Sequence, residues 1–256
     1  MTRKRCLITG TSAGIGLSLA RCYLRAGCEV VGIDRDASKF GIAESDEERA
    51  RLQEVQADLS DPLEVDRLIE VLGERLGKAS FDIIIHNAGV NSVGPFESAV
   101  WQKQAALIEV NLTTPMVLTA RFLEESWVAE GASIVFVSSL SHFVGYPGAA
   151  SYAASKDGLA AYAQSLSAWL KPRGGHVLTV YPGPTRTDHA RRHSPDNSRE
   201  EKRMHPDELA QRIFRAVKER RRTLVPGLAN RLFAAFGHWM PHKSDRAMKK
   251  AILDKL

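Results

Sequence analysis

Short apolar segments alternate with longer segments of helical periodicity along most of the chain. The apolar segments are rich in β-branched residues, as strands buried on both faces are, and read RCLIT, CEVVGID, EVQAD, FDIIIHNAG, ASIVFVSS and HVLTVYPG. Helical patterns cover residues 17–26, 61–77, 101–127 and 150–171. The alternation predicts a doubly wound parallel sheet in a three-layer α/β/α arrangement, with residues 1–256 as one domain because no linker or repeat divides the chain.

The C-terminal part of the chain departs from this alternation. Residues 187–204 are polar and rich in Arg, Ser and Asp, and we expect them to form a mobile loop beside the substrate. Residues 205–256 should form a helical extension on the substrate side. Over 228–240, an apolar residue recurs every four positions, which predicts an amphipathic helix with a stripe of Leu228, Leu232, Phe236 and Met240. We expect this helix to pack on the core or on a second subunit, with contact to a membrane surface as the less favoured alternative.

Composition places the chain among soluble globular proteins, with 44% hydrophobic and 25% charged residues. Apolar runs are too short for a membrane span or a secretory signal, so we expect a cytoplasmic protein. The cysteines Cys6, Cys22 and Cys28 form no CxxC pair and no zinc-like spacing with histidine, which favours reduced, packed thiols and no metal site.

Charge is distributed unevenly along the chain. Residues 186–256 hold 18 Lys/Arg against 9 Asp/Glu, whereas residues 1–185 hold 17 against 21. A basic region can meet nucleic acid, anionic lipid or an acidic substrate, but these charges alternate with apolar positions, which favours a solvated helix face. No nucleic-acid partner is expected, because the chain has no zinc-finger spacing, no aromatic ribonucleoprotein pattern and no basic-region zipper.

The segment TGTSAGIG, residues 9–16, joins the first predicted strand to the first helix. Its glycines, Gly10, Gly14 and Gly16, let the backbone turn sharply and approach a pyrophosphate at the helix N-terminus. Asp34, at the end of the second strand, can accept both hydroxyls of an adenosine ribose and would repel a 2′-phosphate, which favours NAD(H). The adjacent Arg35 could instead hold that phosphate, so NADP(H) remains possible.

Asp58 follows the third predicted strand in the segment QADLSD. Its position allows it to meet the edge of the adenine ring. As an alternative, Asp58 could be an N-cap-like acid before the next helix.

Taken together, these motifs and several further ones resemble the short-chain dehydrogenase/reductase family, in particular its compact single-domain branch. The matching elements, in order over roughly residues 4–190, are TGTSAGIG at 9–16, Asp58, HNAG at 86–89, Asn111 in EVNLTTP, Ser139 in VSSLS, YAASK at 152–156 and PGPTRT at 182–187. The resemblance implies a Rossmann fold, a nicotinamide cofactor and a homodimer or homotetramer formed through the two long helices that carry Asn111 and Tyr152.

A tyrosine and a lysine one helical turn apart are the centre of the predicted chemistry. Positions i and i+4 share a face of a helix, so Tyr152 and Lys156 should meet. A free tyrosine has a pKa of about 10, and a neighbouring cation should lower that pKa toward the working range. The resemblance adds that Lys156 reaches the nicotinamide ribose, that Ser139 binds the substrate oxygen, and that Asn111 holds a water linking Lys156 to solvent. By strand alternation, Ser138 should point to the opposite face from Ser139.

The resemblance also assigns a set of residues to the cofactor. These are Gly10, Ser12, Ala13, Gly14, Ile15, Gly16, Asp34, Arg35, Asp58, Leu59, Asn87, Ala88, Gly89, Tyr152, Lys156, Pro182, Gly183, Thr185 and Thr187. One departure from the family pattern is His86, which replaces the first of two asparagines; we expect it to be a satisfied core residue.

The sequence therefore predicts an NAD(P)-dependent oxidoreductase that interconverts a secondary alcohol and a ketone. Segments 90–96, 140–147 and 188–204 should line the substrate, and SHFVGYPG with the aromatic tail favours a lipophilic molecule. The alternative is a catalytically silent dinucleotide-binding regulatory or scaffold protein. The intact set of Ser139, Tyr152, Lys156 and Asn111 argues against that alternative.

Overall fold

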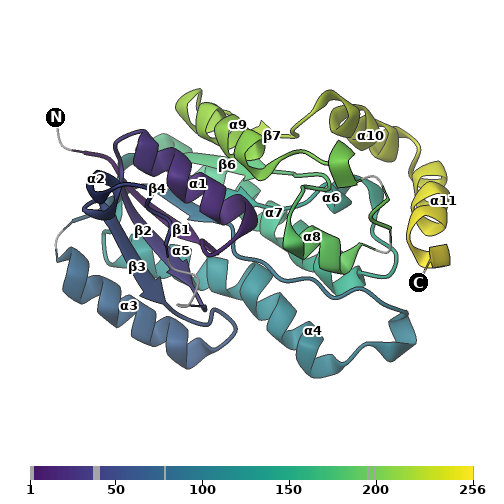
Figure 1. Ribbon diagram of the computed structural model, residues 1–256, viewed down its shortest axis with the longest axis horizontal. Coiled ribbons are helices and arrows are strands. Elements are labelled where there is room, and N and C mark those ends of the chain that lie inside the picture. The colour runs from purple at the N-terminus through teal and green to yellow at the C-terminus, as the bar shows by residue number, and fades with distance from the viewer. Residues whose placement is uncertain (1–2, 37–40, 78, 195, 199, 256) are drawn as a thin grey trace.

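A parallel β-sheet lies between two layers of helices in the computed structural model (Figure 1). The structure describes residues 3–36, 41–77, 79–194, 196–198 and 200–255. Within them, seven strands run in the order β3-β2-β1-β4-β5-β6-β7. The strands are β1 Arg5–Thr9, β2 Glu29–Asp34, β3 Leu52–Gln56, β4 Phe81–His86, β5 Val128–Val137, β6 His176–Val180 and β7 Thr223–Leu224. The predicted doubly wound three-layer architecture is confirmed.

The strand order reverses between β1 and β4, and this reversal positions the site. All strand pairs are parallel, so their carboxyl ends lie along one edge of the sheet. In open α/β sheets, ligands bind at this edge, where the order reverses. The ends of β1 to β6 and the segments that follow them carry the predicted site residues.

Helices α1 (Gly14–Arg25) and α9 (Pro206–Lys218) cover one face of the sheet. Leu19 and Tyr23 of α1 pack with Ile213 of α9 and with apolar side chains of the sheet in one buried cluster. The N-terminus of α9 carries Pro206 at its first position, where a missing N–H costs nothing.

Helices α3 (Pro62–Leu76), α5 (Thr114–Glu124) and α7 (Ala150–Leu170) pack on the opposite face. Leu68, Phe122 and Leu159, one from each helix, belong to a second buried cluster with the sheet. Burial of apolar residues on both faces explains why the strands read as continuous apolar runs instead of alternating patterns.

The helix predicted over 101–127 is interrupted. It forms α4 (Trp101–Ile108), a π-helical turn η3 (Glu109–Thr113) and then α5. The wider turn contains Asn111, whose side chain bonds the backbone of a neighbouring loop. Single π turns within helices are frequently found at functional sites.

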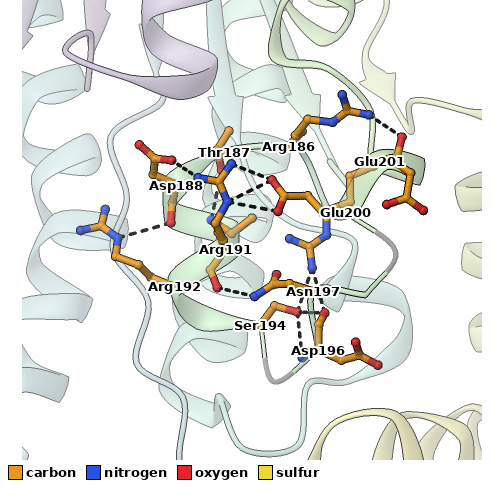
Figure 2. A network of polar contacts seen from close by, with 12 residues as sticks. Arg186, Thr187, Asp188, Arg191, Arg192, Ser194, Asp196, Asn197, Glu200 and Glu201 are labelled. Atoms are coloured by element: carbon orange, nitrogen blue, oxygen red, sulfur yellow. Dashed lines mark hydrogen bonds and ion pairs between the residues drawn. The ribbon is translucent and has the colours of Figure 1, made fainter.

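The segment predicted as a mobile loop over 187–204 contains regular structure. Helix α8 (Asp188–His193) begins at Thr187, whose hydroxyl accepts a hydrogen bond from the Ala190 N–H, and a short turn η5 (Glu200–Lys202) follows. Polar side chains bond to one another across this segment, as Figure 2 shows for Arg191, which contacts both Asp188 and Glu200. The polar and charged residues on which the prediction of a loop rested therefore form a local network of hydrogen bonds and ion pairs.

Two helices form the C-terminal extension, α10 (Leu228–Trp239) and α11 (Pro241–Ala251), which lie beside each other at one end of the molecule (Figure 1). Most members of the 228–240 stripe do not pack on the core of this chain, whereas their packing on a second subunit stays a prediction. Leu228 and Leu232 are 71% and 64% exposed, because α10 instead packs through Ala234 and Gly237. A Cβ at Gly237 would lie 2.1 Å from the Phe143 carbonyl oxygen, so α10 approaches α6 (Ser141–Val144) at backbone distance.

The remaining elements are short: α2 Asp46–Arg49, η2 Phe96–Ser98, η4 Lys171–Arg173 and η6 Leu253–Lys255. No helix in the described part of the chain is long and apolar enough to span a membrane.

Candidate active site

The glycine loop brings the chain into backbone contact with itself at two positions. A Cβ at Gly10, whose φ is +75°, would lie 2.9 Å from the Ala88 Cα, and one at Gly16 would lie 1.8 Å from the Gly10 carbonyl oxygen. Only glycine fits such approaches. The loop therefore leads directly into α1 with its backbone free to approach a ligand, which fits the pyrophosphate of a dinucleotide.

Asn87 and Thr9 hold this loop from the neighbouring strand. The Asn87 amide donates to the carbonyl oxygens of Thr9 and Gly10, at 2.9 and 3.2 Å, and the Thr9 hydroxyl accepts from the Asn87 and Ala88 N–H groups. In this structure the Asn87 amide supports the loop, while Asn87 also lines the larger of two adjacent cavities.

Asp34, the last residue of β2, lies beside the glycine loop. Its carboxylate accepts from the Ser12 N–H at 2.9 Å and from the Asp36 N–H at 3.2 Å. A small cavity beside it is lined by predicted cofactor residues from four segments, namely Gly10, Asp34, Arg35, Asp58, Leu59, Ala88 and Gly89. Carboxylate oxygens at this wall fit the hydroxyls of a ribose.

Asp58 lines the same cavity, and the alternative role considered for it is wrong. The N-cap of α3 is Asp61, whose side chain accepts from the Leu63 N–H. Asp58 instead accepts from the Ser60 N–H and hydroxyl, at 2.9 and 2.7 Å, which fixes the turn after β3. Its contact with adenine stays a prediction.

Tyr152, Lys156 and Ser139 meet beside the glycine loop. Tyr152 and Lys156 lie in the first turns of α7, and the Lys156 Nζ is 5.9 Å from the centre of the Tyr152 ring. The Ser139 side chain, which follows β5, hydrogen-bonds the Tyr152 hydroxyl. Lys156 is buried, and its Nζ donates to the Val137 carbonyl oxygen at 2.9 Å. The i, i+4 prediction on one helix face is therefore realised in the geometry.

Burial, and not the lysine, dominates the acidity of the tyrosine. Removal from water raises the pKa of Tyr152 to about 12, with the Ser139 hydrogen bond acting in the opposite direction. The same burial lowers the pKa of Lys156 to about 8. The expectation that Lys156 brings the Tyr152 pKa toward neutrality is thus wrong for this structure, because desolvation of the phenol is the dominant effect on that pKa.

Asn111 uses its side chain to fasten the loop after β4. Its Oδ1 accepts from the Val90 N–H at 2.8 Å, and its Nδ2 donates to the Val90 carbonyl and to the Ser155 hydroxyl, at 2.9 and 3.0 Å. A Cβ at Gly89 would lie 3.2 Å from the Lys156 Nζ and 3.3 Å from the Asn111 Oδ1. Both side chains therefore border Gly89, while the predicted water path through Asn111 stays a prediction.

The neighbours Ser138 and Ser139 have different partners, as strand alternation predicted. The Ser138 hydroxyl is buried and donates to the Lys156 carbonyl at 2.9 Å. Ser138 therefore fastens β5 to α7, and Ser139 is the serine that contacts Tyr152.

His86 is a core residue, as expected, but only one of its ring nitrogens has a partner among the described residues. Nε2 lies 2.9 Å from the Thr119 hydroxyl, which donates its own hydrogen to the Pro115 carbonyl, so the ring donates from Nε2. Nδ1 is buried without a partner. Desolvation lowers the pKa of His86 to about 3, which keeps the ring neutral.

A larger cavity of about 1090 Å³ extends from Tyr152 and Lys156 to the C-terminal helices. The predicted segment after β6 lines it through Pro182, Gly183, Thr185 and Thr187, and Ile15 of the glycine loop lines it as well. A Cβ at Gly14 would lie 3.1 Å from Thr187 Cγ2, so this segment contacts the loop. The remaining predicted residues, Ser12 and Ala13, lie in the loop between β1 and α1, where the Ser12 N–H donates to the Asp34 carboxylate and Ala13 is the N-cap of α1.

The substrate wall differs in part from the prediction. From the three predicted segments, Asn91, Leu140, Val144, Tyr146 and His189 are among the lining residues, whereas Phe96 is 82% exposed. Met248 of α11, Ile252 and Lys255 of η6, which belong to the extension predicted over 205–256, also line this cavity. Lys255 bonds Asp196 at 2.6 Å, so the chain end is tied to the segment after α8.

No group of three or more His, Cys, Asp or Glu side chains suited to a metal ion occurs within the described ranges. The three cysteines are free thiols.

Comparison with known proteins agrees with this geometry. Residues 4–198 match the family of short chain dehydrogenases, and the chain belongs to that family. It is 36% identical over 185 residues, 69% of its length, to a 1-deoxy-11-beta-hydroxypentalenate dehydrogenase from Streptomyces exfoliatus. This match spans 66% of the length of that relative, and a separate match spans 58% of a protein of the same name from Streptomyces arenae. The chain thus covers less than two thirds of the length of each relative.

A solved structure extends the likeness to nearly the whole chain. A short-chain dehydrogenase from Sphingobium yanoikuyae, in complex with NADPH, superposes with a TM-score of 0.78 at 29% identity, covering 94% of this chain and 95% of the other.

Proposed function

We propose that the protein is an NAD(P)-dependent oxidoreductase that interconverts a secondary alcohol and a ketone, with NAD(H) preferred. The observation that carries the proposal is the convergence of Ser139, Tyr152 and Lys156 on one cavity, directly beside the glycine loop. Family membership supports the same reaction class.

Each protein group has a role that follows from its contacts. The nicotinamide ring accepts or supplies the hydride when the cofactor is bound. In the direction of reduction, Tyr152 donates its hydroxyl proton to the substrate oxygen, and with a pKa of about 12 it holds that proton at neutral pH. Ser139 hydrogen-bonds that oxygen, and the Lys156 ammonium stabilises the phenolate that remains.

The cofactor preference rests on Asp34. A carboxylate at the ribose position accepts hydrogen bonds from hydroxyls and repels a phosphate. The Sphingobium yanoikuyae neighbour binds NADPH, and Arg35 lines the same small cavity here, so NADP(H) is the alternative that the experiment must separate.

The substrate proposed is a lipophilic alcohol or ketone. Leu140, Val144, Phe233, Met248 and Ile252 supply apolar lining along the large cavity. The relatives from Streptomyces are named as dehydrogenases of a hydroxylated compound, which is the same class of reaction.

A catalytically silent dinucleotide-binding scaffold is the second candidate. Burial of the Lys156 ammonium beside Tyr152 costs free energy. This arrangement therefore does not serve the stability of the fold, which is what a scaffold would need. We therefore favour the enzyme.

The test is an activity screen of the purified chain with NADH and NADPH against a panel of aliphatic, cyclic and aromatic ketones. The proposal expects turnover, faster with NADH, and expects Asp34→Ser to shift the preference toward NADPH by roughly 10-fold or more, as loss of one charge repulsion allows. Cofactor binding by calorimetry without turnover on any probe would favour the scaffold. A preference for NADPH in the unaltered protein would overturn the role given to Asp34.

A further inference from the structure

Arg203 lines the large cavity and carries one buried guanidinium nitrogen without a hydrogen-bond partner among the described residues. It follows η5, and its Nη2 donates to the Ser194 hydroxyl and to the Asp196 carbonyl, each at 3.0 Å. These two bonds use both hydrogens of Nη2. Nη1 is buried and has no hydrogen-bond partner among the described residues. Leaving a charged donor buried and unpaired costs more than about 1–3 kcal/mol, so this nitrogen is suited to a partner that the chain itself does not supply.

Carboxylates near this position are already engaged. Arg191 contacts both oxygens of Glu200, as Figure 2 shows, and Asp196 pairs with Lys255. Glu208, which also lines the cavity, pairs with Arg212 at 2.8 Å. Lys202, next to Arg203 in the cavity wall, makes no ion pair within the described part of the chain. Neither Lys202 nor Arg203 forms an ion pair with a carboxylate in the described part of the chain, although the charge of Arg203 acts on Glu200 and helps to lower its pKa.

Arg203 lies near the reacting end of the cavity. Burial raises the pKa of Tyr146, and a hydrogen bond with Asn91 and the charge of Arg203 both oppose that rise, so the guanidinium acts on this phenol. The Tyr146 ring meets the Tyr152 ring edge-on, with centres 6.0 Å apart. Tyr146 is thus within reach of the Arg203 charge and in ring contact with the proposed proton donor.

We propose that the substrate carries a carboxylate on its apolar body and that Arg203 Nη1 binds this carboxylate while Ser139 and Tyr152 hold the reacting oxygen. This inference rests on the proposed function and deepens it. Arginine suits the role because its charge is permanent and its planar fork matches a carboxylate. Val144, Phe233 and Met248 line the space for the apolar body.

The test uses medium-chain oxo acids in which the distance from ketone to carboxylate varies, each paired with its methyl ester. The acid should be preferred in at least one pair, mainly through a lower KM. A hydrogen bond to a charged group contributes about 1.5–3 kcal/mol, so Arg203→Gln should raise the KM of that acid by about 10- to 100-fold and leave its ester unchanged. Arg203→Lys should keep part of the preference. Arg192→Gln, on the exposed side of α8, is the control and should change neither substrate.

Binding of decanoate by calorimetry, in the presence of NADH, gives a second readout that needs no turnover. Arg203→Gln should weaken decanoate binding by about 10-fold or more. The inference is overturned if acids and esters are used equally well, or if the substitution affects both alike. It is also overturned if Arg203→Gln weakens NADH binding and leaves the acid preference intact, because the anion is then a cofactor phosphate. If no probe is turned over but decanoate binding still depends on Arg203, the proposed reaction is contradicted and the carboxylate site is not.

Discussion

At the scale of single residues, the site depends on two groups that burial pushes in opposite directions. Burial raises the pKa of the Tyr152 phenol to about 12, so this group keeps its proton at neutral pH. Burial lowers the pKa of the Lys156 ammonium to about 8, so this group loses its proton as the pH rises above that value. At neutral pH the site thus contains a protonated acid beside a cation that can stabilise its conjugate base. This combination suits ketone reduction.

The pH dependence of reduction follows from the lysine. Because Lys156 is charged below its pKa of about 8 and neutral above it, the rate of ketone reduction should be level from about pH 6 to 7 and should fall above pH 8. Initial rates of NADH oxidation across this range provide the measurement. A rate that rises steadily to pH 10 would show that lysine protonation has no part in the reaction.

The buried lysine should also lower the stability of the fold. A pKa near 8, against 10.5 for a free lysine, means that the unfolded chain binds more protons between those values, so stability rises with pH there. Lys156→Met removes a penalty of roughly 3 kcal/mol at pH 7 and forfeits a hydrogen bond worth about 1 kcal/mol. We expect a net gain of about 2 kcal/mol at pH 7.

Urea unfolding of both proteins at pH 7 and at pH 9.5 measures this gain. The advantage of Lys156→Met should shrink as pH rises through about 8. A substitution that destabilises equally at both values would contradict the account.

At the scale of elements, α10 approaches α6 closely, and residues of both helices line the large cavity. Gly237 permits this contact, since a Cβ there would lie 2.1 Å from a carbonyl oxygen and 2.6 Å from Val144 Cγ1. Gly237→Ala should therefore cost about 1–3 kcal/mol of stability through overpacking and should raise the KM for ketones, because Val144 lines the cavity. Ala235→Ser, on the exposed face of α10, is the matched control.

Thermal unfolding and steady-state kinetics of the two variants make the comparison. A Gly237→Ala protein as stable and as active as the control would show that α10 does not require this close approach.

The elements themselves could be predicted to different degrees. Strands and major helices followed from apolar runs and periodicity, because burial on both faces of a sheet leaves a strong local signal. The π turn at Asn111 could not be predicted in this way, because the Asn111 side chain bonds Val90, which is distant in the sequence. The two-residue strand β7 and the network around Arg191 are likewise too short or too dependent on tertiary contacts to leave a pattern.

The candidate site divides in the same way. Motif spacing predicted that Ser139, Tyr152 and Lys156 would meet. Their positions depend only on one helix, which carries Tyr152 and Lys156, and on the end of one strand, which Ser139 follows. Acidity was not predictable, since the pKa of Tyr152 depends on desolvation by residues that converge only in the fold. Arg203 left no signal, because an arginine in a polar segment gives no indication that one of its nitrogens is buried and unpaired.

At the scale of the whole molecule, apolar side chains remain exposed on the helices that carry the site. Met116 and Val117 of α5 and Trp169 of α7 are 37%, 39% and 48% exposed. We propose that these helices form the interface of the predicted homodimer or homotetramer. Val117→Glu should then reduce the mass measured by light scattering toward that of one chain, whereas Leu63→Glu, on the exposed face of α3, should not. A monomeric unaltered protein would contradict this interface.

Tyr152→Phe tests whether the Tyr152 hydroxyl transfers the proton to and from the substrate oxygen. The substitution keeps the ring against Tyr146 and removes only the hydroxyl. The account predicts that kcat/KM for ketone reduction falls by about 100-fold or more while NADH affinity is preserved, and that Tyr162→Phe on the same helix retains full activity. Turnover by Tyr152→Phe within a few-fold of the unaltered enzyme would contradict it.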